Sequence, residues 1–99
     1  MDDMRSLVEA VVCDIPWGRV MTYGDLAAAS GYPGAARRVG TIASQGTPEH
    51  PWHRVVASAG RITTEGTWQS DSLTAEGIIV QDNRIQCFAT LRWFPEIEG

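Results

Sequence analysis

The sequence predicts a mainly helical fold with small β-hairpins, arranged as a winged helix–turn–helix domain. Three observations support this prediction. Apolar residues recur at helical spacing near the N-terminus, two further helical segments flank a Gly-Tyr-Pro-Gly turn, and the second half holds short apolar runs separated by turn residues. A length of 99 residues suits one modest core, so we expect residues 1–99 to form a single domain.

The N-terminal half should contain three helices. The apolar face of the first helix comprises Met4, Leu7, Val8, Val11 and Ile15. Pro16 and Gly18 should end this helix. A second helix should begin near Tyr23, because Thr22 followed three residues later by Asp25 resembles a capping box. The turn over 31–34 then separates it from a third helix over 35–43.

The second half should hold a loop, two hairpins and a short helix. A loop is expected over 45–51, where two prolines occur, and a hairpin over 55–62. Residues 72–76 are expected to form one or two helical turns with Gly77 as the C-cap. The apolar runs 78–80 and 85–91 flank Asp82 and Asn83, which indicates a second hairpin.

The charge balance is acidic overall but uneven along the chain. All eight basic residues are Arg, and with twelve acidic residues the net charge is −4. Taken as a whole, this balance argues against a nucleic-acid-binding protein, since such proteins usually carry a basic excess. Residues 16–64, however, hold five Arg and two acidic residues, a net +3, against −7 in the rest. Because binding to a polyanion depends on the local face, DNA binding stays open.

Cys13 and Cys87 show neither the spacing nor the neighbouring histidines of a metal site or a disulfide framework. Their pattern is typical of a reduced, cytoplasmic chain without a bound metal. The N-terminus is acidic where a signal peptide would be basic, and no apolar run approaches the roughly 18 residues of a membrane span. We therefore expect no membrane association.

The segment 22–43 predicts a helix–turn–helix with a distinctive second helix. Gly34, Ala35 and Ala36 open that helix with almost no side chain, and Arg37 and Arg38 follow near its N-terminus, where backbone N–H groups attract phosphates. Small residues followed by arginines suit insertion into a DNA groove. The same residues fit an ordinary two-helix corner with solvated arginines, and the pattern alone does not choose between the two interpretations.

The segment Pro51-Trp52-His53-Arg54 directly precedes an apolar run. His53 suggests a catalytic base with Glu76 as its candidate partner, although no Ser or Cys nucleophile adjoins it and a single His more often serves the structure. Trp52 would offer either a stacking surface or a core side chain, and composition favours the core.

Four segments, in chain order, carry a resemblance to a known family. They are IPWGRVMTYGDLA at 15–27, AARRVG at 35–40, PWHRVV at 51–56 and LTAEG at 73–77. Together they resemble the signature motifs of the O6-alkylguanine-DNA alkyltransferases. The resemblance implies the winged helix–turn–helix fold of the C-terminal, DNA-binding domain of those enzymes.

The resemblance breaks at the position of the acceptor cysteine, where this chain has Trp52. An indole forms no thiolate, so alkyl transfer to this position is excluded, and neither Cys13 nor Cys87 replaces it by position. The PWHR form resembles that of the alkyltransferase-like proteins. It implies a non-enzymatic monomer with no catalytic residue and no cofactor. Such a protein binds double-stranded DNA containing O6-alkylguanine and passes the lesion to nucleotide excision repair, in the cytoplasm or, in a prokaryote, at the nucleoid.

The resemblance also implies roles for individual residues. The implied DNA-binding residues, which approach the minor groove, are Thr22, Tyr23, Gly34, Ala35, Ala36, Arg37 and Arg38. Among them, Arg37 would enter the base stack and Tyr23 would rotate the nucleotide. The implied lesion pocket comprises Tyr23, Trp52, His53, Val55, Val56 and Glu76. With no thiol to deprotonate, the pair of His53 and Glu76 should fix the pocket wall.

Two departures from the family keep alternatives open. The loop 45–50 is shorter than in many of the enzymes, and Glu65 is acidic where some relatives carry a basic residue that stacks on the damaged base. Three other functions stay compatible with the sequence: an alkyltransferase with a different acceptor, a winged-helix DNA-binding regulator, and a protein-interaction module without lesion specificity.

Overall fold

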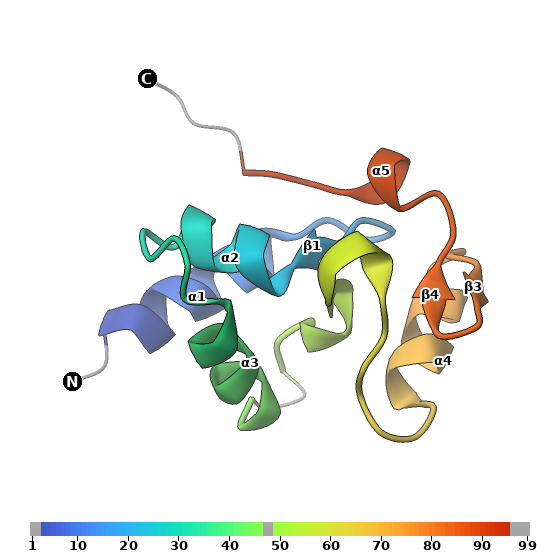
Figure 1. Ribbon diagram of the computed structural model, residues 1–99, viewed down its shortest axis with the longest axis horizontal. Coiled ribbons are helices and arrows are strands. Elements are labelled where there is room, and N and C mark those ends of the chain that lie inside the picture. The colour runs from blue at the N-terminus through green and yellow to red at the C-terminus, as the bar shows by residue number, and fades with distance from the viewer. Residues whose placement is uncertain (1–2, 47–48, 96–99) are drawn as a thin grey trace.

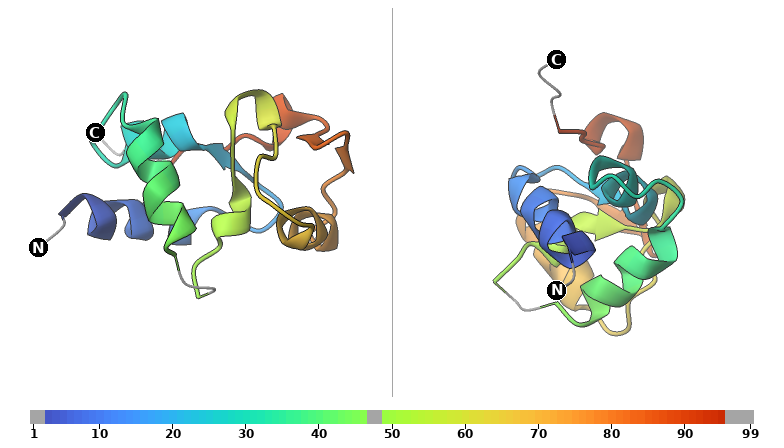
Figure 2. Two further views of the ribbon diagram at one scale, coloured as in Figure 1. Left: turned by 60° about the horizontal axis from the view of Figure 1, so that its bottom comes forward. Right: turned by 90° about the vertical axis from the view of Figure 1, so that its left-hand side faces the viewer.

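Helices α1, α2 and α3 gather at one end of the molecule, and α4 with a small hairpin forms the other end (Figure 1). The computed structural model describes residues 3–46 and 49–95, so Thr47 and Pro48 of the expected loop lie outside the described part. In chain order the elements are α1 (Asp3–Asp14), β1 (Met21–Thr22), α2 (Tyr23–Ala29), α3 (Ala36–Ser44), η1 (Trp52–Arg54), β2 (Val55–Val56), η2 (Ser58–Gly60), α4 (Trp68–Ala75), β3 (Val80–Gln81), β4 (Arg84–Ile85) and α5 (Phe88–Leu91). The 3₁₀ turn η1 lies between α3 and α4 in two different views (Figures 1 and 2).

Helix α1 packs on the core with a face that differs from the expected one. Its buried residues, together with Ile15 just beyond it, are Met4, Val8 and Val12. Their spacing of three to four residues keeps them on one side of a helix. Leu7, expected on the buried face, is 47% exposed. Each residue turns a helix by about 100°, so Leu7 lies about 100° around the helix from Val8. The line of Met4, Val8 and Val12 faces the core, and Leu7 therefore lies at the edge of the buried face.

The helix–turn–helix forms as its sequence predicts. The Asp25 N–H donates to Thr22 Oγ1 at 2.9 Å and the Thr22 N–H donates to Asp25 Oδ2 at 3.2 Å, which confirms the capping box at the start of α2. Gly31 and Gly34 have φ of 90° and 86°, a conformation that glycine adopts without a steric penalty. The turn therefore brings α3 back against α2, where the core holds both helices.

Strands β1 and β2 form a two-stranded parallel sheet at the centre of the fold. Met21 lies opposite Val55, and Thr22 lies opposite Val56. The hairpin expected over 55–62 is therefore wrong, since β2 pairs with β1 and residues 58–60 form the turn η2. A central parallel pair is packed on both faces, which explains why consecutive residues of both strands are buried instead of alternating between buried and exposed. This pairing sets the start of α2 beside the Trp52 segment.

The far end of the molecule holds α4 and a short hairpin. Helix α4 begins four residues earlier than expected, and Gly77, with φ of 81°, follows its C-cap. Strands β3 and β4 pair antiparallel, with Asp82 and Asn83 at φ of 52° and 58° between them. Two positive φ values are typical of a type I′ turn, so this hairpin is confirmed, although its second strand ends at Ile85 and residues 88–91 form α5. No helix within the described residues has the length and apolar character needed to cross a membrane.

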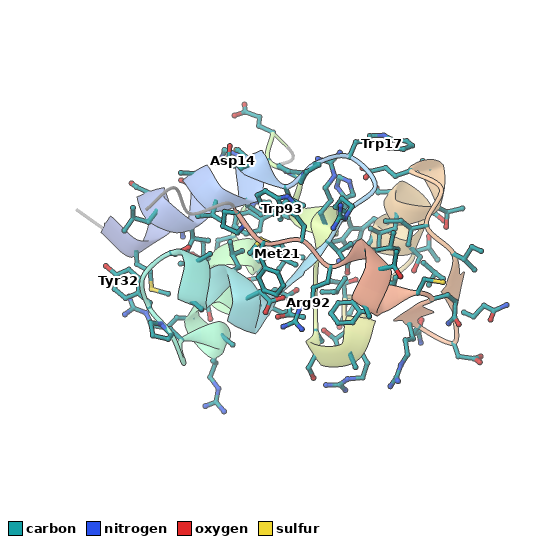
Figure 3. All side chains as sticks on the ribbon, turned by 90° about the horizontal axis from the view of Figure 1, so that it is seen from above. Asp14, Trp17, Met21, Tyr32, Arg92 and Trp93 are labelled. Atoms are coloured by element: carbon teal, nitrogen blue, oxygen red, sulfur yellow. The ribbon has the colours of Figure 1, made fainter. Side chains whose placement is uncertain are left out.

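Residues 91–93, here called the C-terminal strap, cross the molecule next to β1. The Val20 N–H donates to the Leu91 carbonyl at 3.0 Å, and the Trp93 N–H donates to the Val20 carbonyl at 2.8 Å. Figure 3 shows Arg92 and Trp93 on this strap. Arg92 donates to both carboxylate oxygens of Asp25, at 2.8 and 2.6 Å. Burial raises the pKa of Asp25, but these hydrogen bonds outweigh it and lower the pKa, so the strap holds a charged cap at the start of α2.

Candidate functional site

A cavity of about 780 Å³, here called the aromatic cavity, opens between α3, η1 and the start of α4. Side chains that line it include His50, Trp52, His53, Thr64, Glu65 and Trp68. Trp52 is 7% exposed and also packs in the core cluster of α1 and α2, whereas Trp68 is 50% exposed. Trp52 is thus a core side chain, as composition favoured, that also contributes to the cavity wall.

Gly46 fixes where the Trp52 ring can lie. A Cβ at position 46 would come within 2.1 Å of Trp52 Nε1 and 2.6 Å of two ring carbons, so only glycine leaves room for the indole. Among the described residues, Trp52 Nε1 finds no hydrogen-bond acceptor. Packing therefore holds the ring, without a hydrogen bond from Nε1 to any described residue.

Glu76 is the centre of a partly buried hydrogen-bond network behind the aromatic cavity. One carboxylate oxygen lies 2.5 Å from His53 Nε2, and the Gly18 N–H donates to the other at 2.6 Å. Arg54 donates to both oxygens through Nε, at 3.1 Å each, and to one of them through Nη2 at 2.8 Å. Arg54 Nη1 also donates to the Ile15 carbonyl at 2.9 Å. Glu76 and Arg54 thus fasten the Trp52 turn to the ends of α1 and α4.

The charge of Glu76 is stabilised by these partners. Burial by itself raises the pKa of this carboxyl group, but the hydrogen bonds from Arg54, Gly18 and His53 outweigh it and lower the pKa to about 2. The Glu76 carboxyl group is therefore ionised at neutral pH. A permanently charged carboxylate orients His53 but leaves no neutral acid at this position.

A second hollow, here called the helix groove, has a volume of about 730 Å³ and lies along the start of α2 and α3. Thr22, Tyr23, Ala36, Arg37 and Arg61 are among the side chains that line it. Tyr23 also lines a smaller cavity of about 100 Å³ together with Trp52 and Trp68. Tyr23 thus stands where the helix groove meets the aromatic cavity. Burial raises the pKa of the Tyr23 phenol, so its hydroxyl keeps its proton and can donate.

The structure places the remaining predicted site residues differently. Val55 and Val56 are fully buried in the two core clusters, and Glu76 lies behind the wall, so these three support the cavity without lining it. Val55 and Val56 form β2, which is packed on both faces, so their side chains contact the core and not a ligand. Gly34 and Arg38 are exposed, and Ala35 packs partly against the core. None of these last three lines the helix groove.

Sequence reasoning missed several lining residues, among them Arg61, Trp68 and His50. Trp68 carried a signal, because it is an isolated large aromatic side chain in the polar stretch 63–72, where a core role is hard to justify. Arg61 and His50 carried none, since their place depends on how η2 and the 49–51 segment return to the core. Among the described residues, no three His, Cys, Asp or Glu side chains converge to hold a metal ion.

Comparison with known proteins adds to this geometry. Residues 3–78 match the profile of the 6-O-methylguanine DNA methyltransferase, DNA binding domain. The chain is 40% identical to the DNA base-flipping protein of Vibrio parahaemolyticus, over 96% of this chain and 100% of the relative. It is also 40% identical to alkyltransferase-like protein 1 of Schizosaccharomyces pombe, over 79% of each chain.

Solved structures give the same picture. The fold resembles that of S. pombe Atl1 in complex with damaged DNA containing O6-carboxymethylguanine, with a TM-score of 0.81 and 34% identity over 96% of this chain and 98% of that one. It resembles Mycobacterium tuberculosis OGT in complex with DNA with a TM-score of 0.71 and 31% identity, over 77% of this chain and 50% of that one. Fold and cavity together define a helix–turn–helix DNA-binding domain of the alkyltransferase type. The chain belongs to the 6-O-methylguanine DNA methyltransferase family, which confirms the resemblance and the fold class.

Proposed function

We propose that this protein recognises O6-alkylguanine in double-stranded DNA and leaves the alkyl group in place. The observation that carries the proposal is Trp52, which occupies the position of the family's acceptor cysteine and forms part of the aromatic cavity. An indole cannot accept an alkyl group by thiolate attack. The proteins most similar in sequence include one named a DNA base-flipping protein and one named an alkyltransferase-like protein.

The helix groove is the proposed contact with the DNA minor groove. Ala36 and Gly40 line it with almost no side chain, and Arg37 projects beside them. A minor groove is about 6 Å wide, so small residues on α3 allow a close approach while Arg37 enters the base stack. Flipping a nucleotide costs a few kcal/mol, less for a poorly paired lesion, and the guanidinium that replaces the base offsets part of that cost.

Tyr23 is the proposed link between the two surfaces. Because it lines both the helix groove and the small cavity beside Trp52, a nucleotide rotated at Tyr23 would pass directly into the aromatic cavity. Its protonated hydroxyl can donate to the neighbouring phosphate. Thr22, which caps α2 and lines the helix groove, fixes the position of Tyr23 next to it in the chain.

The aromatic cavity is the proposed receptor for the flipped base. Trp52 and Trp68 offer apolar surface for the ring and for its alkyl group, at about 0.8 kcal/mol for each buried methylene. Glu65 also lines this cavity. The flipped base would therefore meet a carboxylate at the position where some relatives carry a basic residue that stacks on it. Recognition by this chain would therefore depend on aromatic contact. Arg54, Glu76 and His53 keep the cavity wall in place.

The deciding experiment compares binding of the protein to matched duplexes that contain guanine or O6-methylguanine at one position. Tighter binding to the O6-methylguanine duplex is expected. Trp52→Ala should reduce this preference, Arg37→Ala should weaken binding to both duplexes, and the exposed Arg84→Ala should change neither. Equal affinity for both duplexes would contradict the proposal and favour a general DNA-binding regulator.

Two further parts of the proposal concern chemistry and partners. Mass spectrometry after incubation with purified alkylated DNA should show no mass gain on the protein, because the acceptor position is an indole. The lesion would then pass to nucleotide excision repair, with the protein acting as a monomer in the compartment that holds the DNA. Loss of excision from O6-alkylguanine duplexes when the protein is omitted from a reconstituted repair reaction would support this; unchanged excision would oppose it.

A further inference from the structure

Cys13, His50 and Glu9 form a cluster on the surface beside the Trp52 turn. Cys13 Sγ lies 3.0 Å from His50 Nδ1, and His50 Nε2 lies 3.7 Å from Glu9 Oε2. Glu9 and Cys13 are one helical turn apart on the same face of α1, and His50 reaches them from the segment before η1. The sequence showed no histidine near Cys13, so this contact exists only in the folded chain.

The three groups stand in the order nucleophile, base and carboxylate. A carboxylate beside Nε2 favours the imidazole tautomer with its hydrogen on that nitrogen. The lone pair of Nδ1 then faces the thiol and can take its proton. A thiol within hydrogen-bond reach of a base, with the base oriented by a third group, is the arrangement that activates a cysteine nucleophile.

The thiol is also accessible to a reagent. Cys13 is exposed, and it borders a surface hollow of about 430 Å³ that Pro51 and His53 also line. Cys13 does not line the aromatic cavity, so a base flipped against Trp52 would not reach it. Any electrophile that meets this thiol would therefore come from solution.

We propose that Cys13 is a nucleophilic modification site for small carbon electrophiles of the alkylating class. The thiol proton passes to His50 Nδ1, and Glu9 stabilises the imidazolium that forms. The sulfur lone pair then forms an S–C bond while the bond from that carbon to its leaving group breaks, and the leaving group departs with the electron pair. His50 finally releases the proton to water, leaving a thioether at Cys13.

The test uses Cys87 of the same protein as an internal reference. Cys87 is also exposed, and among the described residues no histidine or carboxylate pairs with its thiol. The folded protein is treated with limiting iodoacetamide near neutral pH, quenched and cleaved after arginine. This places the two cysteines in separate peptides, 6–19 and 85–92, whose carbamidomethylation is measured over time by mass spectrometry.

We expect Cys13 to react about tenfold faster than Cys87, because an adjacent base that takes the thiol proton activates the sulfur as a nucleophile. His50→Gln should lower the Cys13 rate to that of Cys87 and leave the Cys87 rate unchanged, and an unchanged far-ultraviolet circular dichroism spectrum would show that the fold persists. Glu9→Gln should lower the Cys13 rate less. Glu49→Gln, a carboxylate change on the same surface, is the matched control and should have the smallest effect.

Two results would overturn the proposal. Equal rates at Cys13 and Cys87 in the unmodified sequence would show that the contact with His50 does not activate the thiol. A fast Cys13 rate that persists in His50→Gln would show that another group is responsible.

Discussion

Replacing Glu76 with Gln should destabilise the fold by about 2 kcal/mol at neutral pH. The carboxylate accepts hydrogen bonds from Arg54, His53 and the Gly18 N–H, and an amide keeps its shape but not its charge. A pKa lowered from 4.5 to about 2 corresponds to about 3 kcal/mol of stability, at about 1.4 kcal/mol for each pH unit. Water at the edge of the network screens part of this attraction, which leaves about 2 kcal/mol.

The pH dependence of the effect has a definite sign. Because the pKa of Glu76 is lower in the folded protein than in the unfolded chain, its contribution is complete above pH 4.5. It then declines as the pH falls and is lost near pH 2. The free energy of unfolding, measured by urea denaturation and circular dichroism, should therefore fall more steeply with acid in the unmodified protein than in Glu76→Gln. The two proteins should approach equal stability towards pH 2.

Glu65→Gln is the control for this measurement, because Glu65 is exposed and none of the hydrogen bonds that hold Glu76 involves it. Its stability should match that of the unmodified protein at each pH. If Glu76→Gln were as stable as the unmodified protein at neutral pH, the charge of Glu76 would not hold the network together. A gap of constant size between the two proteins across the acid range would lead to the same conclusion.

Three other substitutions test the site and its supports. Trp68→Ala should weaken binding to the O6-methylguanine duplex about tenfold in a fluorescence titration, because stacking contributes about 1–3 kcal/mol for each base. An unchanged affinity would show that Trp68 does not contact the flipped base. Gly46→Ala should lower the melting temperature and displace the Trp52 ring, because an added Cβ would lie 2.1 Å from Trp52 Nε1. The displacement should shift the indole N–H resonance of Trp52, and an unshifted resonance would contradict the prediction. Asp25→Asn should lower the free energy of unfolding by about 1 kcal/mol at neutral pH, because it weakens the capping box of α2 and the ion pair with Arg92. Equal urea midpoints for the two proteins would argue against a role for the strap.

The site divides between residues that the sequence could predict and residues that it could not. The sequence offers Glu76 as a candidate partner of His53, the family resemblance implies the same pair, and the structure brings the two side chains to 2.5 Å. Trp68 was not assigned to the site, because its isolation in a polar segment marks it as unusual but does not show that the start of α4 lies beside the Trp52 turn. Cys13 was considered without a partner, because His50 lies 37 positions away in the chain.

The sequence by itself determined the features that depend on neighbours in the chain. The cap at Thr22, the glycines of the 31–34 turn and the positive φ values at Asp82 and Asn83 each follow from hydrogen bonds or steric limits within a few residues. Its motifs also determined the family. Only the tertiary structure decided that β2 pairs with β1 and that the first helix buries Val12 instead of Leu7. The same holds for Trp68 beside the aromatic cavity and for Cys13 against His50. The physical reason is that these choices are set by which surfaces fill the shared core, and a pattern of apolar residues does not specify its partners across the chain.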